Sequence, residues 1–422
     1  MTTSPAFHLL AKPTGAVCNL DCKYCFFLSK EALYPGSRFR MSDEVLEQYI
    51  RQYIAAHQIP ELTISWQGGE PTLMGLDFFR RSVELVEKYK NPGMQIHYTM
   101  QTNGTKLDDE WGAFLRKHHF LVGISIDGPP HIHNTYRRDK GNQPSFDQVH
   151  RGLGYLKKHN VDFNILCTVH AANADHPLTV YRFFRDELQA RFIQFIAIVE
   201  RDNETGYQEG NTVTDRSVEP EQYGDFLISV FDEWVRRDVG EVFVQIFDVA
   251  LAAWYGAPPS VCVFAPTCGD ALALEHTGDL YSCDHFVEPT YLLGNIMDTS
   301  MVELVGSQQQ RKFGQDKLDT LPRYCLECPV RFVCHGGCPK NRFIQTPDGQ
   351  SGLNYLCAGY RKFFAHIDRP MRIMRSLLQQ NRAPSEIVHI EAQLQAAFAR
   401  ARPGDPCPCG SGRLFGECHG AG

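Results

Sequence analysis

Residues 18–25 read CNLDCKYC and place three cysteines, Cys18, Cys22 and Cys25, in one short loop. A tetrahedral zinc site or a fully coordinated four-iron cluster takes four protein ligands, and this loop offers three. The spacing therefore predicts a metal centre with one open coordination position. A zinc site that borrows a distant fourth ligand is the alternative interpretation of the same cysteines.

Short β-rich runs alternate with amphipathic helical stretches from residue 6 to about 200, which is the pattern of βα units on a parallel sheet. The six expected strands are Phe7–Lys12, Leu62–Trp66, Gln95–Met100, Leu121–Ile126, Phe163–Val169 and Phe192–Val199. The helices expected between and after them include Ser42–His57, Asp77–Lys90, Phe146–His159 and Glu219–Arg237. A further strand is expected at Val242–Val249, and residues 366–400 are expected to be helical.

Polar motifs follow three of these strands directly. QGGEP (67–71) follows the second strand, QTNG (101–104) follows the third, and SIDGP (125–129) closes the fourth. Loops at the carboxyl ends of barrel strands converge on one site, so these motifs are expected to face the same cavity as the cysteine loop. Each motif alone is also compatible with an ordinary turn, because Gly-Gly and Asn-Gly are common turn pairs.

A second group of eight cysteines supplies enough thiolates for two complete four-iron clusters, with zinc as the alternative metal. Its members are Cys262, Cys268, Cys283, Cys325, Cys328, Cys334, Cys338 and Cys357. A third group, Cys407, Cys409, Cys418 and His419, follows a linker at 402–406 and offers the ligands of a tetrahedral zinc site. Free, disordered thiols are the alternative for that tail. Cys167 stands alone in an apolar run and is expected to be a buried structural thiol.

Composition narrows the class of protein. A chain of 422 residues with 43% hydrophobic content is expected to form one large domain with smaller appendages. The net charge of -7 and the pI of about 6.2 come without long like-charge runs, which argues against nucleic acid and anionic membranes as partners. No apolar run approaches the roughly 20 residues of a membrane span, and Met1–Leu10 lacks the features of a signal peptide. A cytoplasmic protein is expected, in which fifteen cysteines serve metal ligation rather than disulfides.

The first cysteine loop, with Tyr24 before its last cysteine, resembles the motif of the radical S-adenosylmethionine (SAM) superfamily, in which SAM chelates the open iron. The Gly-Gly-Glu-Pro stretch resembles the superfamily motif that binds the SAM ammonium, which implies that role for Gly68, Gly69 and Glu70. The same resemblance implies four further SAM contacts. Ser125 and Arg137 would contact the ribose and carboxylate, and Tyr24 and Ile198 would lie near the adenine. Arg138 adjoins Arg137, and either arginine is also compatible with a solvated surface charge.

The second cysteine group closely resembles the SPASM domain of radical SAM enzymes that modify peptides and proteins. The resemblance assigns Cys262, Cys268, Cys283 and Cys338 to a first auxiliary cluster and Cys325, Cys328, Cys334 and Cys357 to a second. Full cysteine coordination favours electron transfer or structural support over substrate ligation at these clusters. The tail resembles the SEC-C zinc-binding motif, although residues 413–417 replace its usual lysines, so a binding partner does not carry over.

The run Cys283-Asp284-His285 resembles the anaerobic sulfatase-maturating enzymes, in which this aspartate is the proposed catalytic base. The resemblance implies oxidation of a cysteine or serine of a sulfatase to Cα-formylglycine, with flavodoxin or ferredoxin as electron donor. A cap of the cluster loop is the alternative role for Asp284. The rival functions are a SPASM maturase of a ribosomally made peptide and a non-catalytic iron-sulfur carrier or zinc adaptor.

The expected fold is α/β: a partial (β/α)6 radical SAM barrel, a cysteine-rich auxiliary-cluster domain and a small zinc motif. The expected division is a barrel at 1–235, a SPASM domain at 236–365, a helical linker at 366–402 and a SEC-C tail at 403–422.

Overall fold

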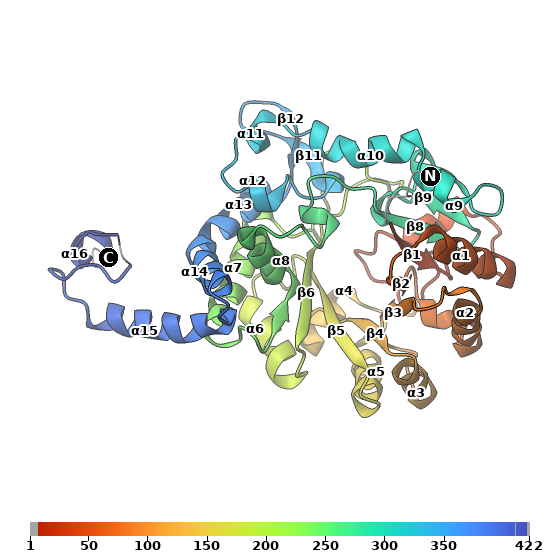
Figure 1. Ribbon diagram of the computed structural model, residues 1–422, viewed down its shortest axis with the longest axis horizontal. Helices are drawn as coiled ribbons and strands as arrows, with labels where there is room; N and C mark the ends of the chain where they lie inside the picture. The colour runs from red at the N-terminus through yellow and green to blue at the C-terminus, as the bar shows by residue number, and fades with distance from the viewer. Residues whose placement is uncertain (1–6, 410, 420–422) are drawn as a thin grey trace.

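The computed structural model describes residues 7–409 and 411–419 of the chain. Gly410 and residues 420–422 of the expected tail, and residues 1–6 of the expected barrel, lie outside the described residues. The architecture is a ten-stranded mixed sheet with helices over its outer face and a cysteine-rich region against one end (Figure 1). No helix among the described residues is both long enough and apolar enough to cross a membrane.

The sheet confirms the six expected parallel strands, which run in chain order. They are β1 (His8–Lys12), β2 (Glu61–Trp66), β3 (Gln95–Thr102), β4 (Phe120–Ser125), β5 (Asp162–Val169) and β6 (Phe192–Ala197). Alternating helices cover them: α1 (Asp43–Ala56), α2 (Leu76–Tyr89), α3 (Asp109–Lys117), α4 (Pro130–Tyr136), α5 (Phe146–Lys158), α6 (Pro177–Arg182) and α7 (Pro220–Arg237). The Ser42 hydroxyl caps α1 by accepting a 3.3 Å hydrogen bond from the Val45 amide, as its place before two acidic residues indicates.

The expected strand Val242–Val249 is wrong. Only Phe243–Val244 (β7) pairs with β6, and helix α8 (Gln245–Tyr255) begins at the next residue. A short apolar run does not separate a strand from a buried helix, and here the alanine-rich continuation favours the helix. Gly256, with φ of +90°, ends α8 in the left-handed conformation that glycine adopts without strain.

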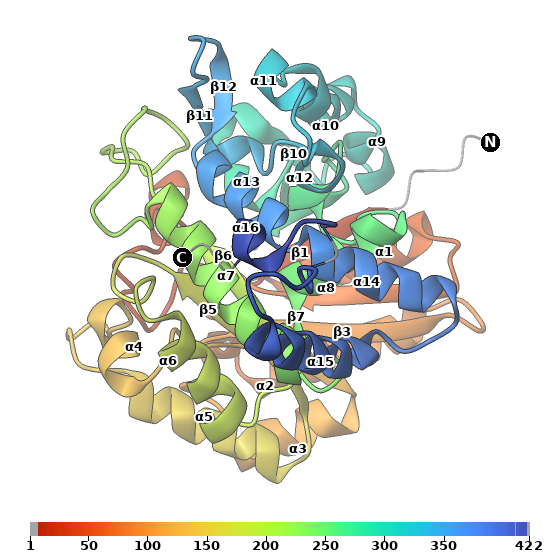
Figure 2. The same ribbon diagram turned by 90° about the vertical axis from the view of Figure 1, so that its left-hand side faces the viewer.

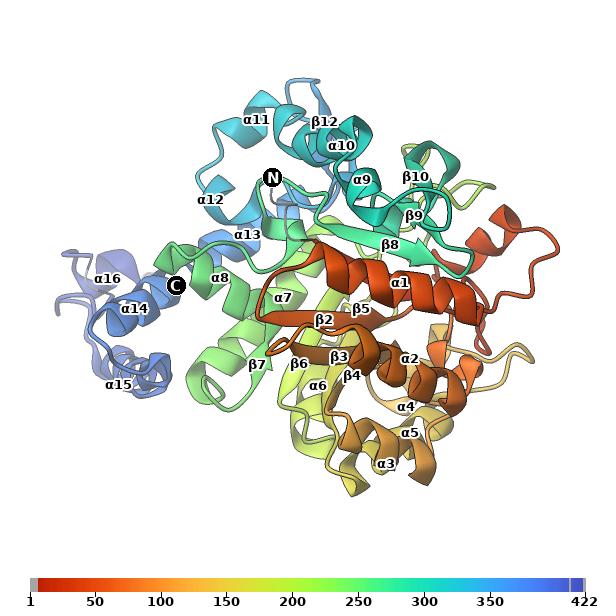
Figure 3. The same cartoon turned by 45° about the vertical axis from the view of Figure 1, so that its right-hand side comes forward.

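The cysteine-rich region is joined to the sheet through β8 (Ala271–Glu275; Figure 3), and β8 pairs in parallel with β1 along its whole length. Strands β9 (Asp279–Tyr281) and β10 (Leu292–Asn295) extend the same sheet in antiparallel fashion. A separate hairpin, β11 (Arg342–Gln345) and β12 (Ser351–Asn354), lies beyond them. The helices of this region are α9 (Met301–Val305), α10 (Gln308–Asp319), α11 (Arg323–Leu326), α12 (Arg331–Cys334) and α13 (Cys357–His366).

The C-terminal helices follow the cysteine-rich region and lead away from the sheet (Figure 1). Helix α14 (Asp368–Gln379) packs against α8, and α15 (Ile387–Arg400) then crosses α7 (Figure 2). The expected helical stretch 366–400 is confirmed, with a break between these two helices. The short helix α16 (Phe415–Cys418) stands away from the sheet at the end of α15 (Figure 1).

Candidate active site

The first cysteine loop leaves β1 at the carboxyl edge of the sheet and is fastened to the loop that follows β2. The Gly69 amide donates to the Gly15 carbonyl at 2.8 Å, and the Glu70 amide donates to the Val17 carbonyl at 2.9 Å. A Cβ on Gly69 would lie 2.0 Å from the Val17 oxygen, so only glycine permits this approach. The glycine pair therefore holds the cysteine loop in place as well as leaving backbone accessible.

The three thiols of the loop lie close enough to act on one another. Burial raises the pKa of Cys18 to about 12, and the Glu70 carboxylate adds to that rise. Burial also raises the pKa of Cys22 to about 12, with Cys25 and Cys18 contributing. Such thiols ionise when a metal replaces their protons, so this set of three half-buried donors fits a cluster whose binding releases protons.

Glu70 organises the loops around these cysteines. Its side chain is fully buried, and its Oε1 accepts hydrogen bonds from the Thr72 hydroxyl at 2.6 Å and the Thr102 hydroxyl at 2.7 Å. Its Oε2 accepts from the Asn103 amide at 2.7 Å. The carboxylate thus joins the loop after β2 to the loop after β3, and a contact to a SAM ammonium stays a prediction.

Tyr24 and Arg137 both bind the carboxylate of Asp127. This aspartate is part of the motif at 125–129, but nothing in the sequence indicated its role. The Tyr24 hydroxyl and the Arg137 Nε, at 2.8 Å, both donate to Oδ2 of buried Asp127. Burial opposes ionisation of Asp127, but the charge and hydrogen bond of Arg137, together with neighbouring His170, outweigh burial and hold the pKa of Asp127 well below its usual range. Tyr24 also stacks on His170 with ring centroids 5.4 Å apart. Arg138, by contrast, donates to a carbonyl near the surface.

Ser125 and Ile198 occupy the ends of their strands. The Ser125 hydroxyl is buried at the end of β4 and accepts a 3.0 Å hydrogen bond from the Gln101 side chain. Ile198 follows β6 half-buried, and its amide donates to the Val169 carbonyl at 2.8 Å. Both positions lie at the carboxyl edge of the sheet, where the motifs were expected to converge.

A cavity of about 610 Å³ lies between the parallel strands and the cysteine-rich region. Side chains of the strands, including His8 and Leu10, line this cavity together with Gln67 and Asp284. Cys262 and Cys338 also reach this cavity. A substrate side chain in it would therefore meet the Asp284 carboxylate and two ligands of the first auxiliary set.

Asp284 is paired with a lysine that sequence patterns did not reveal. The ammonium of Lys12, on β1, donates to Asp284 Oδ1, and the Lys12 side chain is only 2% exposed. Burial raises the pKa of Asp284, but the Lys12 charge, neighbouring His285 and the hydrogen bonds from Lys12 and Gln67 together outweigh burial and lower that pKa below its ordinary value. The carboxylate is therefore ionised, and the hydrogen bond from Lys12 fixes its orientation. No signal in the sequence joins residues that are 272 positions apart.

The eight cysteines of the second group separate into two sets in space. Burial raises the pKa of Cys283, and so does the charge of neighbouring Cys338 and Cys262. Cys338 and Cys262 act in the same way on the pKa of Cys268, which burial raises to about 12. The other four thiols, Cys325, Cys328, Cys334 and Cys357, line one cavity. This grouping agrees with the two ligand sets that the resemblance implies, and ligation of clusters by these cysteines stays a prediction. The described cysteines form no disulfide.

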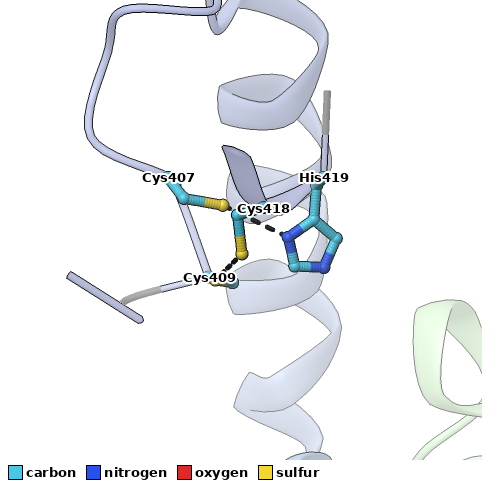
Figure 4. A group of neighbouring side chains, drawn as sticks. All are labelled: Cys407, Cys409, Cys418 and His419. Carbon is cyan, nitrogen blue, oxygen red and sulfur yellow. Dashed lines mark hydrogen bonds between the residues drawn. The ribbon is translucent and has the colours of Figure 1, made fainter. Parts of the chain in front are cut away.

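The tail brings together Cys407, Cys409, Cys418 and His419, whose ligand atoms all lie within 4.8 Å of one another (Figure 4). The Sγ atoms of Cys409 and Cys418 are 3.7 Å apart, and Cys407 Sγ lies 3.2 Å from His419 Nδ1. Tetrahedral zinc with Zn–S bonds of about 2.3 Å separates its sulfurs by about 3.8 Å. The donor set and its spacing therefore fit zinc.

Three family models match the chain. Residues 13–184 match the radical SAM superfamily, residues 262–329 match SPASM, an iron-sulfur cluster-binding domain, and residues 405–421 match the SEC-C motif. The serine-type anaerobic sulfatase-maturating enzyme of Bacteroides thetaiotaomicron is 45% identical over 393 residues, which cover 90% of this chain and 94% of the relative. The cysteine-type enzyme of Clostridium perfringens is 34% identical over 365 residues, which cover 86% and 96%.

Two solved structures are similar to this chain in fold. Native anSMEcpe with bound AdoMet and the Cp18Cys peptide is 34% identical with a TM-score of 0.79, covering 89% of this chain and all of that chain. Streptococcus suis SuiB bound to the precursor peptide SuiA is 16% identical with a TM-score of 0.56, covering 80% of this chain and 73% of that chain. The second likeness extends to the fold alone.

Proposed function

The chain belongs to the anaerobic sulfatase-maturating enzymes, a family of radical SAM proteins, and we propose that it oxidises a cysteine or serine side chain of a sulfatase to Cα-formylglycine. The observation that carries the proposal is the position of Asp284, ionised and paired with Lys12 in the wall of the cavity. This cavity also reaches Cys262 and Cys338 of the first auxiliary set. The proposed base and the proposed electron acceptor would therefore both adjoin this cavity.

The residues of the chain would divide the reaction between them. Cys18, Cys22 and Cys25 would hold the SAM-cleaving cluster, with Gly68, Gly69 and the Asp127-held pair Tyr24 and Arg137 around SAM. When bound, cluster and SAM supply the 5'-deoxyadenosyl radical that removes a Cβ hydrogen from the substrate side chain. Asp284 then accepts the thiol or hydroxyl proton. The second electron would leave towards the groups held by the auxiliary cysteines, which completes a two-electron oxidation to an aldehyde from serine or a thioaldehyde from cysteine. Water would then convert the thioaldehyde to the aldehyde of formylglycine with release of hydrogen sulfide.

The cofactor content belongs to the same proposal. Three cysteines near the N-terminus and eight in the SPASM region imply three four-iron clusters, so the anaerobically reconstituted protein should carry about twelve irons. One zinc should occupy the tail. A reproducible count near four irons, with zinc in the remaining sites, would contradict the auxiliary clusters.

The cellular setting and domain division complete the proposal. Reduced thiols and low-potential clusters suit the cytoplasm, with flavodoxin or ferredoxin as the electron donor. The division into a barrel at 1–235, a SPASM domain at 236–365, a helical linker at 366–402 and a zinc tail at 403–422 follows the changes in cysteine content.

Activation of an inactive sulfatase tests the function directly. A sulfatase produced without maturase would be incubated anaerobically with the reconstituted protein, SAM and a reductant, and its sulfatase activity measured. Activity should appear with SAM and stay absent without it. Parallel sulfatases with cysteine or serine at the modified position would show which type is preferred, and activation of neither would contradict the proposal.

A further inference from the structure

Helix α10 turns an unusual face towards the first auxiliary cysteines. Its buried residues are Gln310, Gly314 and Lys317, a polar stripe at helical spacing with no large apolar side chain. A Cβ on Gly314 would lie 2.1 Å from the Cys268 carbonyl oxygen, and the Cys268 amide donates to the Gly314 carbonyl at 3.2 Å. Gln310 donates to the Gly269 carbonyl at 2.7 Å. The helix is therefore packed directly on the loop that carries Cys268.

Lys317 extends this contact to the next cysteine of the set. Its ammonium donates to the carbonyl of Cys262 and, at 3.0 Å, to that of Val263. The residue is 1% exposed, and it forms no ion pair with any carboxylate in the part of the chain that the structure describes. The sulfur atoms of Cys268, Cys338 and Cys262 are the nearby groups that can carry negative charge opposite this ammonium. A buried ammonium is costly unless an anion compensates it, and these thiolates are the anions at hand.

Arg342 lies between the two auxiliary sets. Its guanidinium donates to the Lys317 carbonyl at 2.5 Å, to the His335 carbonyl at 2.9 Å and to the Gly336 carbonyl at 3.0 Å. The acceptors at 335 and 336 belong to the short segment that joins Cys334 of one set to Cys338 of the other. Among the described residues, Arg342 likewise has no carboxylate partner, and the thiolates that act on its pKa come from both sets.

We propose that Lys317 and Arg342 are redox-positioning residues, one buried and one half-buried cation that raise the reduction potentials of the auxiliary clusters and so make them acceptors for the substrate's second electron. The proposal rests on the proposed function, since it requires clusters at these cysteines. One-electron reduction adds a negative charge to a cluster whose four thiolates stay bound. A nearby fixed cation stabilises the reduced form, most strongly where solvent is excluded. Lys317 acts on the first cluster, and Arg342 acts on both.

Redox titration of the whole reconstituted protein, followed by electron paramagnetic resonance, tests this. Lys317→Met removes the charge and keeps an unbranched side chain of similar length. Lys317→Arg keeps the charge. Lys312→Met is the matched control, because Lys312 lies on the same helix with a 71% exposed side chain. The N-terminal cluster, recognised by the change of its signal when SAM is added, serves as an internal reference.

In Lys317→Met the equilibrium constant for reduction of the first auxiliary cluster should fall at least tenfold, which is about 59 mV for a one-electron couple. Lys312→Met should leave it unchanged, and Arg342→Met should lower the potentials of both auxiliary clusters. Retained clusters with unchanged potentials in Lys317→Met would overturn the inference and leave the proposed function intact. Absence of auxiliary iron from the unmodified protein would instead contradict the proposed function.

If Lys317→Met loses the first cluster, the Lys317→Arg variant shows whether the missing charge or the changed shape is the cause. If Lys317→Arg keeps the cluster at the unmodified potential, the positive charge is what the cluster requires, as proposed. If Lys317→Arg also loses the cluster, the lysine acts through its shape and hydrogen bonds, and the redox role is overturned.

Discussion

The Lys12 ammonium donates to the Asp284 carboxylate and joins the first strand of the parallel sheet to the cysteine-rich region, 272 residues further along the chain. Lys12 also lies over the Phe27 ring, 3.9 Å from its centroid. The pair fixes one carboxylate oxygen in the wall of the cavity. Strand β8, which pairs with β1 from His8 to Lys12, holds the two regions in this register.

Removal of the Lys12 charge should disorder the proposed base without removing it. Lys12→Met keeps the apolar stem and leaves Asp284 without its buried partner, so the carboxylate loses its orientation. We expect formylglycine formation to fall at least tenfold while iron content and SAM cleavage persist. Lys12→Arg should recover part of the loss. Assay of deoxyadenosine and aldehyde in the same reaction measures both, and unchanged coupling in Lys12→Met would show that the pair has no part in catalysis.

Asp284→Asn keeps the volume of the side chain and removes the proton acceptor. Clusters and uncoupled SAM cleavage should persist, while aldehyde on a sulfatase peptide falls about a hundredfold or more, as is typical when a general base is lost. Product formation at the unmodified rate would reduce Asp284 to a structural cap. Loss of cluster iron would show that the loop geometry, rather than proton transfer, depends on it.

The tail should bind zinc independently of the catalytic region, because it stands away from the sheet at the end of α15 (Figure 1). Cys409→Ser removes one of four ligands and should abolish zinc binding, while Ser411→Ala keeps all four and serves as the control. Since the small segment depends on its metal to fold, Cys409→Ser should also be cleaved faster by trypsin at Arg413. Zinc measured by mass spectrometry at unmodified levels in Cys409→Ser would contradict this site.

Asp248 makes stability depend on pH. It lies on α8 in a second cavity, beside Phe192 and Phe243, and burial raises its pKa to about 7. A carboxyl whose folded pKa lies above its unfolded value favours folding when protonated, so stability is lost as pH rises from about 4 to about 7. Asp248→Asn should therefore raise the free energy of unfolding at pH 8 by about 1–3 kcal/mol, and with it the thermal midpoint. The same substitution should have little effect near pH 4. An equal change at both pH values would contradict the assignment.

The sequence predicted the six parallel strands β1 to β6 because each had a local apolar pattern and each helix between them a local amphipathic one, whereas strands β8, β9 and β10 of the same sheet were not predicted. Val242–Val249 failed because its apolar run fits a buried helix equally well, and the alanines beyond it decided the outcome. Cys167 was correctly expected to be buried, since a lone cysteine in an apolar strand seldom binds metal.

Long-range contacts set the limit of prediction at the site. The cysteine spacings and motifs are local, and they pointed to the loops that the structure brings to one edge of the sheet. Lys12, Lys317 and Arg342 acquire their roles only through partners that are distant in sequence or lie on separate elements. A lysine in a strand or a polar helix has no local pattern that marks it as buried beside a carboxylate or a cluster.

Mass spectrometry of a sulfatase peptide after anaerobic turnover with SAM and a reductant distinguishes directly whether this protein forms formylglycine. The reconstituted protein should produce the mass loss of formylglycine at the cysteine or serine of the peptide. Cys25→Ala should produce neither deoxyadenosine nor modified peptide, because an incomplete cysteine loop cannot hold the cluster that cleaves SAM. An unmodified peptide in the presence of rapid SAM cleavage by the unmodified protein, or product formed by Cys25→Ala, would contradict the account.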